Sequence, residues 1–100
     1  MITTESLSKY IQHIKDDYLN WSDNGSAYVK AFNVEYKIGR KYIKVTTNNS
    51  VHSFIVIKET DKFKIGDILM AASYNAPATN FSRGNILEND FSLIRWTGAI

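Results

Sequence analysis

The sequence of 100 residues contains no cysteine and a single proline. The absence of cysteine excludes disulfide scaffolds, cysteine-ligated zinc, iron–sulfur clusters and thiol nucleophiles. A chain of this length buries one core of modest size, which leaves no room for separate catalytic and cofactor domains. We therefore expect one domain over residues 1–100, with no cofactor and no metal.

Long hydrophobic runs are also missing from the chain. The longest are residues 54–57 and 68–72, whereas a membrane-spanning helix needs about 20 apolar residues. The first residues lack the basic and apolar regions of a signal peptide, and isoleucine stands at position 2, where a myristoylated chain has glycine. These absences predict a soluble intracellular protein with no membrane partner.

Neither sign of charge dominates the sequence. Twelve Lys and Arg residues stand against ten Asp and Glu residues, which gives a formal net charge of +2. A bias this small does not by itself indicate nucleic-acid binding. The chain does have aromatic residues, at 13%, and an apolar fraction of 44%, so it can form a packed core.

Residues 5–20 are predicted to form an amphipathic helix. Apolar side chains recur there at intervals of three and four, which places them on one helical face. They are Leu7, Tyr10, Ile11, Ile14, Tyr18 and Trp21. Thr3, Thr4 or Ser6 can cap the start of this helix, and the turn-forming run at residues 22–26 ends it.

From residue 28 onward the apolar pattern has a period of two, which is typical of strands. Strands are predicted at residues 32–38, 42–47 and 51–57. Residues 63–72 read as a further strand, which is interrupted at Gly66 by either a bulge or a turn.

These elements predict an α+β fold, in which one N-terminal helix packs on an antiparallel sheet of three to five strands arranged as a meander. The sheet spans about residues 28–72, an ordered loop follows at about 73–86, and residues 91–100 form a short strand or a tail. The pattern does not decide which face of the sheet the helix covers, because residues 51–57 are apolar on both sides.

The two histidines do not suggest catalysis. His52 precedes Ser53, but neighbouring residues of a strand point to opposite faces, so we do not expect them to act together. His13, Asp16 and Asp17 share one edge of the predicted helix, where a solvated surface is a simpler interpretation than a metal site. We predict no catalytic residues, no metal ligands and no enzymatic activity.

Basic residues cluster around the first predicted hairpin, where Glu35 is the only acid between residues 30 and 44. Cations next to an aromatic ring can contact phosphates beside a stacked base. The candidate nucleic-acid-binding residues are Lys37, Arg40, Lys41, Tyr42 and Lys44. The alternative is that these charges keep a sheet edge from pairing with other chains.

The ordered loop admits two interpretations. In the structural one, Pro77 and Gly84 fix the backbone, while Arg83 and Asn85 hold the loop through hydrogen bonds, Arg83 to Asp67 or to a carbonyl group. In the functional one, the loop is a binding site, since loops on a rigid scaffold often carry function. Its candidate protein-binding residues are Tyr74, Asn75, Arg83 and Asn85.

The same loop carries a resemblance to small proteins of tailed bacteriophages. Those proteins have a signature like Ala-Ser-Trp-Lys-Ala-Pro-Ala, followed by Arg-Gly-Asn-Ile or Arg-Gly-Asn-Val. Upstream they have a Lys-Tyr-x-Lys-Val strand, a Ser-Val-His-x-Phe-Val strand and a Gly-Asp pair. The matching segments here are residues 70–78, 83–86, 41–45, 50–55 and 66–67, so the resemblance covers about residues 40–86.

The chain departs from that signature in two places. Tyr74 and Asn75 stand where the signature has Trp-Lys, which removes one basic group, and the spacer between Ala78 and Arg83 is slightly longer. The resemblance implies a phage origin, a compact fold and a location in the host cytoplasm or the virion. It supplies no catalytic residue.

Taken together, the sequence predicts a small, non-enzymatic phage accessory protein that binds a host or viral protein. The ordered loop would supply shape and hydrogen bonds, and Arg40, Tyr42 and Lys44 of the hairpin would supply charge and an aromatic contact. One alternative is a nucleic-acid-binding protein that uses the basic hairpin at residues 37–44. The other is a virion component that assembles with copies of itself through sheet edges or its apolar tail. Salt dependence and size in solution distinguish the three.

Overall fold

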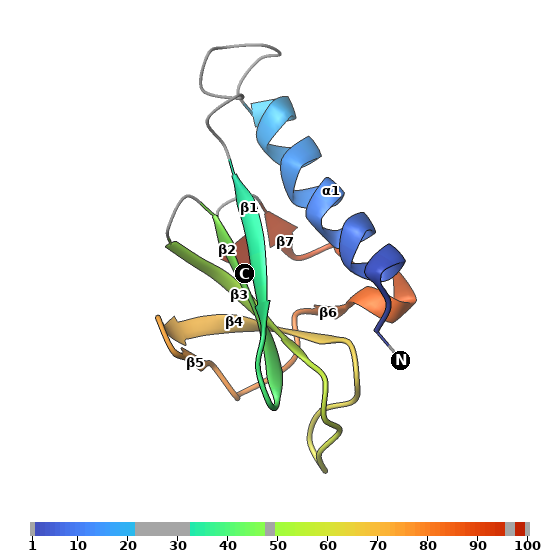
Figure 1. Cartoon of the computed structure of the whole chain (residues 1–100), viewed down its shortest axis with the longest axis vertical. Helices are drawn as coiled ribbons and strands as arrows, with labels where there is room; N and C mark the ends of the chain where they lie inside the picture. The colour runs from blue at the N-terminus through green and yellow to red at the C-terminus, as the bar shows by residue number, and fades with distance from the viewer. Residues whose placement is uncertain (1, 22–32, 48–49, 96–97, 100) are drawn as a thin grey trace.

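The computed structural model describes residues 2–21, 33–47, 50–95 and 98–99 of the chain. One helix precedes an antiparallel sheet, which confirms the predicted α+β fold (Figure 1). The elements are α1 (Thr4–Trp21), β1 (Val34–Ile38), β2 (Tyr42–Thr47), β3 (Ser50–Val56), β4 (Asp67–Ser73), β5 (Ala76–Pro77), β6 (Gly84–Asn85), the 3-10 helix η1 (Ile86–Glu88), β7 (Ile94–Arg95) and β8 (Gly98–Ala99).

Helix α1 begins at a capping box. The Ser6 N–H donates to Thr3 Oγ1 (3.1 Å), and the Thr3 N–H donates to Ser6 Oγ (2.9 Å). Both backbone N–H groups therefore have acceptors at the helix end, where the helix itself supplies none. The buried side chains of α1 are Leu7, Tyr10, Ile14 and Tyr18, which confirms most of the predicted apolar stripe. The side chain of Trp21 and the turn at residues 22–26 lie outside the described residues.

The sheet follows the predicted meander, with β1 to β5 adjacent in chain order and β6 also paired with β4. Helix α1 covers the face that carries Ile43, Val45, Ile55 and Ile68, which form one core with its own apolar residues. A second cluster on the opposite face contains Phe54, Val56, Phe63 and Leu69. Strand β3 is therefore buried on both sides, which accounts for its continuous apolar run.

Gly66 marks a turn and not a bulge, so residues 63–65 are not part of a strand. Strand β4 begins at Asp67, and the Gly66 N–H donates to the Val56 carbonyl (2.8 Å). Gly66 has φ +94°, and a Cβ there would lie 2.7 Å from Asn85 Oδ1. Glycine is required at this position for both reasons.

The geometry predicted for His52 and Ser53 is wrong. Val45 pairs with Ser53 while Thr46 pairs with Val51, so His52 is the additional residue of a β-bulge. Both side chains are buried, and His52 Nδ1 lies 2.8 Å from Ser53 Oγ. A bulge interrupts the alternation of side chains between the two faces of a strand. The prediction that His52 and Ser53 point to opposite faces assumed that alternation.

His52 belongs to a buried chain of hydrogen bonds whose direction is fixed at one end. The Arg95 carbonyl only accepts, so the proton of His52 lies on Nε2, which donates to it (2.6 Å). Nδ1 must then accept from the Ser53 hydroxyl, which in turn accepts from the Tyr10 hydroxyl (2.6 Å). Burial raises the pKa of Tyr10, which keeps this hydroxyl protonated. This network of hydrogen bonds joins α1 and β3 to β7.

We expect acidification to destabilise the fold through His52. Burial lowers the pKa of His52 below its ordinary value of 6.5, so below that pH the unfolded chain binds a proton that the folded chain rejects. The free energy of unfolding should fall by up to about 1.4 kcal/mol per pH unit. Urea denaturation between about pH 8 and about pH 5 measures this slope.

Two variants separate the titration from the hydrogen bonds. Tyr10→Phe removes the hydroxyl but keeps the imidazole, so it should lower stability at every pH and keep the slope. His52→Gln removes the titrating group and should flatten the profile. A His52→Gln profile as steep as that of the wild type would contradict this account.

Candidate functional site

The β1–β2 hairpin and the turn after β4 enclose a hollow of about 280 Å³ on the sheet face opposite α1. We call it the basic cleft. Its lining residues are Lys37, Ile38, Gly39, Arg40, Lys41, Tyr42, Lys44, Phe54 and Asn75. All five residues predicted as nucleic-acid contacts therefore border one hollow.

Strand register concentrates positive charge in the basic cleft. Lys37 of β1 lies directly opposite Lys44 of β2, and like charges in this position destabilise a sheet. Arg40 and Lys41 lie exposed in the connecting loop. Within the described part of the chain, no carboxylate lies within 4.0 Å of any of these four cations. The fold thus gathers four positive charges that form no close ion pair with a described carboxylate.

Two of the four predicted protein contacts, Tyr74 and Asn75, lie beside the predicted nucleic-acid contacts at the basic cleft. Tyr74 and Asn75 form the turn between β4 and β5, which reaches over Lys44 of β2. Lys44 Nζ donates to Asn75 Oδ1 (3.0 Å) and lies 4.0 Å from the centre of the Tyr74 ring. Tyr74 is 57% exposed, so an aromatic surface stands next to a fixed cation.

Arg83 lies inside the loop and not on a contact surface. It is only 5% exposed, and Nη1 donates to Asn80 Oδ1 (2.8 Å) and to the Phe81 carbonyl (2.7 Å). Its guanidinium also stacks 3.8 Å from the centre of the Phe81 ring. Arg83 therefore holds the loop, as the structural interpretation expects, and a backbone carbonyl is among its acceptors.

Asn85 is 4% exposed, and both the oxygen and the nitrogen of its side-chain amide form hydrogen bonds. Its Oδ1 caps η1 by accepting from the Leu87 N–H (2.8 Å) and the Glu88 N–H (3.2 Å). Its Nδ2 donates to the Ile65 carbonyl (3.1 Å) and to Asp67 Oδ1 (3.0 Å). Of the four predicted protein contacts, Tyr74 and Asn75 are therefore exposed, while Arg83 and Asn85 are structural.

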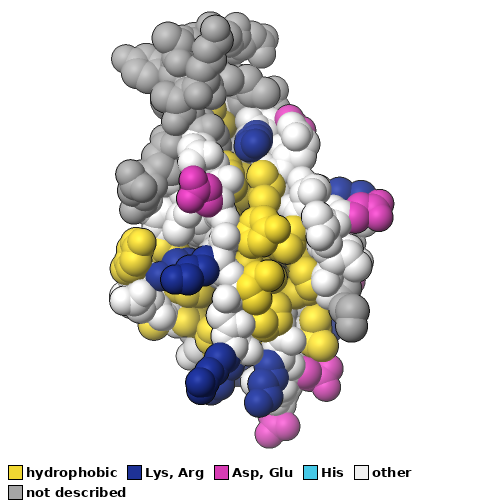
Figure 2. Space-filling view, in the orientation of Figure 1, with side chains coloured by type: hydrophobic (Ala, Val, Ile, Leu, Met, Phe, Trp, Pro, Cys, Tyr) yellow, Lys and Arg dark blue, Asp and Glu magenta, His cyan; other side chains and the backbone are white. Residues whose placement is uncertain are grey.

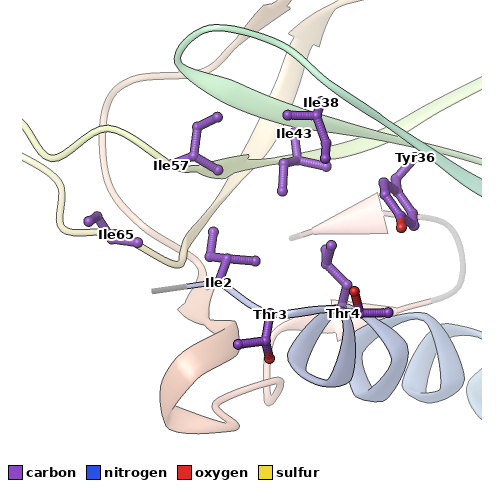
Figure 3. Close-up of a pocket in the computed structure, with 9 residues that line it drawn as sticks. Ile2, Thr3, Thr4, Tyr36, Ile38, Ile43, Ile57 and Ile65 are labelled. Atoms are coloured by element: carbon purple, nitrogen blue, oxygen red, sulfur yellow. The ribbon is translucent and has the colours of Figure 1, made fainter.

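A second hollow, of about 420 Å³, lies on the other side of the β1–β2 hairpin, and the sequence analysis missed it. Its lining residues are Ile2, Thr3, Thr4, Leu7, Tyr36, Ile38, Ile43, Ile57 and Ile65, and we call it the apolar groove. Side chains from the sheet and from the start of α1 point toward one another across it (Figure 3). Figure 2 shows hydrophobic side chains in a strip between β1 and α1.

The exposed apolar residues of β1 were the available signal for the apolar groove. Tyr36 and Ile38 have the alternation of a core-facing strand, yet they are 41% and 64% exposed. They stand on the first strand of the sheet, where α1 does not cover them fully. A core pattern on an edge strand can therefore also mark an uncovered apolar surface.

The helix edge considered for a metal site is occupied by other interactions. His13 Nε2 donates to the Ile94 carbonyl (3.0 Å), and Asp16 Oδ1 accepts from Gln12 Nε2 (2.8 Å). Among the described residues, no three His, Asp or Glu side chains form a group that could hold a metal ion. The described helices also include none with the length and apolar character needed to cross a membrane.

Comparisons with known proteins give no further guidance on this site. No protein-family model, no curated protein and no solved structure matches the chain. Function is therefore inferred from the basic cleft and from the residues that surround it.

Proposed function

We propose that the protein is a non-enzymatic binding protein that holds single-stranded nucleic acid in the basic cleft. The observation that carries this proposal is the cross-strand pair Lys37 and Lys44, joined by Arg40 and Lys41, with no carboxylate within 4.0 Å among the described residues. A fold that places like charges opposite each other gains stability when an anion lies between them. The phosphates of a nucleic acid supply that charge.

The exposed Tyr74 ring beside the basic cleft favours a single strand over a duplex. The Tyr74 ring is mostly exposed and lies beside Lys44, so a base can stack on it while its phosphate meets the ammonium group. In a duplex the faces of the bases are already stacked on each other.

The resemblance to phage proteins suggests the setting for this activity. In that setting the protein is an accessory factor in the host cytoplasm, where single-stranded RNA and DNA of host and virus are both present. Sequence-independent binding through phosphate contacts and stacking fits such a role.

A second candidate function is binding of a host or viral protein through the ordered loop. It is favoured by two exposed rings on that loop, Tyr74 at 57% and Phe81 at 51%. Exposed aromatic residues are frequent anchors of protein interfaces. Binding of this kind depends on apolar contact, so it should persist at high salt and after nuclease treatment.

Fluorescence anisotropy with labelled oligo-dT and oligo-rU of about 16 nucleotides tests the proposed function. For three to four phosphate contacts, a plot of log K against log salt concentration should have a slope of about −2 to −3. Lys44→Met and Arg40→Ala should each make the slope shallower by about 0.7, since each removes one contact.

Lys15→Ala is the matched control, because Lys15 is exposed on α1 and outside the basic cleft. It should leave affinity and slope at the wild-type values. A salt-independent affinity, or equal losses in Lys15→Ala and Lys44→Met, would remove the basic cleft as the binding site.

A further inference from the structure

Strand β1 is an open edge of the sheet. It is first in the strand order, and among the described residues its one pairing partner is β2. The Gly39 N–H donates to the Tyr42 carbonyl (2.9 Å), so Gly39 and Tyr42 are a hydrogen-bonded pair of the β1–β2 hairpin. Every second residue of β1 counted back from Gly39 then also forms hydrogen bonds with β2. By alternation, the backbone groups of Glu35 and Lys37 face β2, while those of Val34, Tyr36 and Ile38 face outward.

The outward-facing groups of Tyr36 and Ile38 are available to another strand. No hydrogen bond joins the backbone of Tyr36 or Ile38 to described residues beyond β2. The side chains of these two residues border the apolar groove and are 41% and 64% exposed. An edge with free amides and exposed apolar side chains is a surface on which a further strand can add.

The sequence of β1 is complementary to itself. When two copies of Val34–Ile38 run antiparallel about Tyr36, Val34 lies opposite Ile38, Glu35 opposite Lys37 and Tyr36 opposite Tyr36. Opposite charges then meet on one face, and apolar side chains meet on the other. Tyr36 has its backbone groups turned outward, so the central pair can exchange two hydrogen bonds.

We propose that β1 pairs antiparallel with β1 of a second copy of this chain, with the two-fold axis at Tyr36. The pairing joins two sheets into one and places two Glu35–Lys37 ion pairs across the axis. It extends the strip of hydrophobic side chains between β1 and α1 into the second copy (Figure 2). Because the arrangement is closed, it leaves no β1 edge for open-ended assembly.

The dimer does not depend on nucleic-acid binding. The axis is perpendicular to the joined sheet, so the basic clefts of both copies lie on the same face. Lys37 pairs with Glu35 of the second copy, which leaves Arg40, Lys41 and Lys44 of each cleft for an anion. Self-association measured without nucleic acid therefore tests the dimer alone.

A charge-reversal series tests the pairing by sedimentation equilibrium over a range of protein concentrations. In the dimer, Glu35→Lys places a lysine opposite Lys37 of the second copy at two symmetry-related positions. Lys37→Glu likewise places two glutamates opposite each other at both positions. Each variant should therefore weaken the dimer about tenfold or more. The double variant Glu35→Lys/Lys37→Glu restores opposite charges and should dimerise within a few-fold of the wild type. A wild-type chain that stays monomeric, or a double variant no stronger than the singles, would overturn the proposal.

A cysteine cross-link provides a second measurement that does not depend on the charges. The chain has no cysteine, so Tyr36→Cys introduces a single thiol at the two-fold axis. Hydrogen-bonded antiparallel partners have Cα atoms about 5.5 Å apart, which suits a disulfide. Under mild oxidation Tyr36→Cys should form covalent dimers much faster than Leu93→Cys, whose side chain is 42% exposed elsewhere. Equal rates would contradict a two-fold axis at Tyr36.

Discussion

Reversal of two charges in the basic cleft, in an Arg40→Glu/Lys44→Glu variant, is expected to weaken binding of single-stranded nucleic acid at least 100-fold. Each charged hydrogen bond to a phosphate contributes about 1.5 kcal/mol or more, and about 1.4 kcal/mol corresponds to a factor of ten. The loss should be greatest at low salt, where screening is weakest. Anisotropy titrations at two salt concentrations measure it.

A matched variant separates the basic cleft from the overall charge of the protein. Lys15→Glu/Lys58→Glu changes the net charge by the same amount at two exposed positions that do not line the cleft. It should weaken binding only a few-fold, through the long-range field alone. If both double variants lose affinity equally, binding follows net charge and the cleft has no special role.

Replacement of Asn85 by alanine is expected to lower the free energy of unfolding by about 4 kcal/mol. The variant loses four hydrogen bonds of a buried amide, including the cap of η1, and each contributes about 1 kcal/mol. It also leaves Asp67 Oδ1 without its Asn85 donor in a buried position. Urea denaturation monitored by circular dichroism measures the change, and a loss below about 1 kcal/mol would contradict this role.

The Asn85→Asp variant supplies the matching control. It keeps an oxygen for the η1 cap but places a carboxylate where Nδ2 now lies 3.0 Å from Asp67. Two carboxylates so close do not both ionise readily, so the variant should be unstable at neutral pH and recover part of its stability in mild acid. Asn85→Ala has no such carboxylate pair and should show no recovery of this kind.

Local patterns were sufficient to predict the helix and the main strands. The spacing of Leu7, Tyr10, Ile14 and Tyr18 directly encodes the buried face of α1. Alternation likewise located β1 and β2, and the apolar run of β3 indicated burial on both sides. In each case the pattern and the packing have the same period, so the sequence carries the information locally.

The features that escaped prediction depend on contacts between distant parts of the chain. The bulge at His52 arises where β3 meets β2, and its hydrogen bonds reach Tyr10 and Arg95, so no local pattern reveals it. The burial of Arg83 likewise depends on Phe81 and Asn80, which fold around its guanidinium. The structural interpretation of the loop expected Arg83 to hold it, but the sequence did not identify Asn80 and Phe81 as its partners.

Both halves of the candidate site were predicted from the sequence, but the contact between them was not. The basic hairpin and the loop residues Tyr74 and Asn75 were predicted as two separate clusters, which lie about 30 residues apart in the sequence. In the structure Lys44 contacts both loop residues, since β3 and β4 carry the chain back to the hairpin. Sheet topology, which composition does not encode, thus turns two weak candidates into one positively charged cleft.

Binding of single-stranded nucleic acid in the basic cleft is tested most directly by NMR. At 100 residues the ¹⁵N-labelled protein is small enough for amide shifts to be followed during titration with oligo-dT or oligo-rU. The account predicts the largest changes at residues 37–44 and 74–75, with little change along the exposed face of α1. An absence of shifts, or a set confined to the loop around Phe81 and to α1, would contradict it.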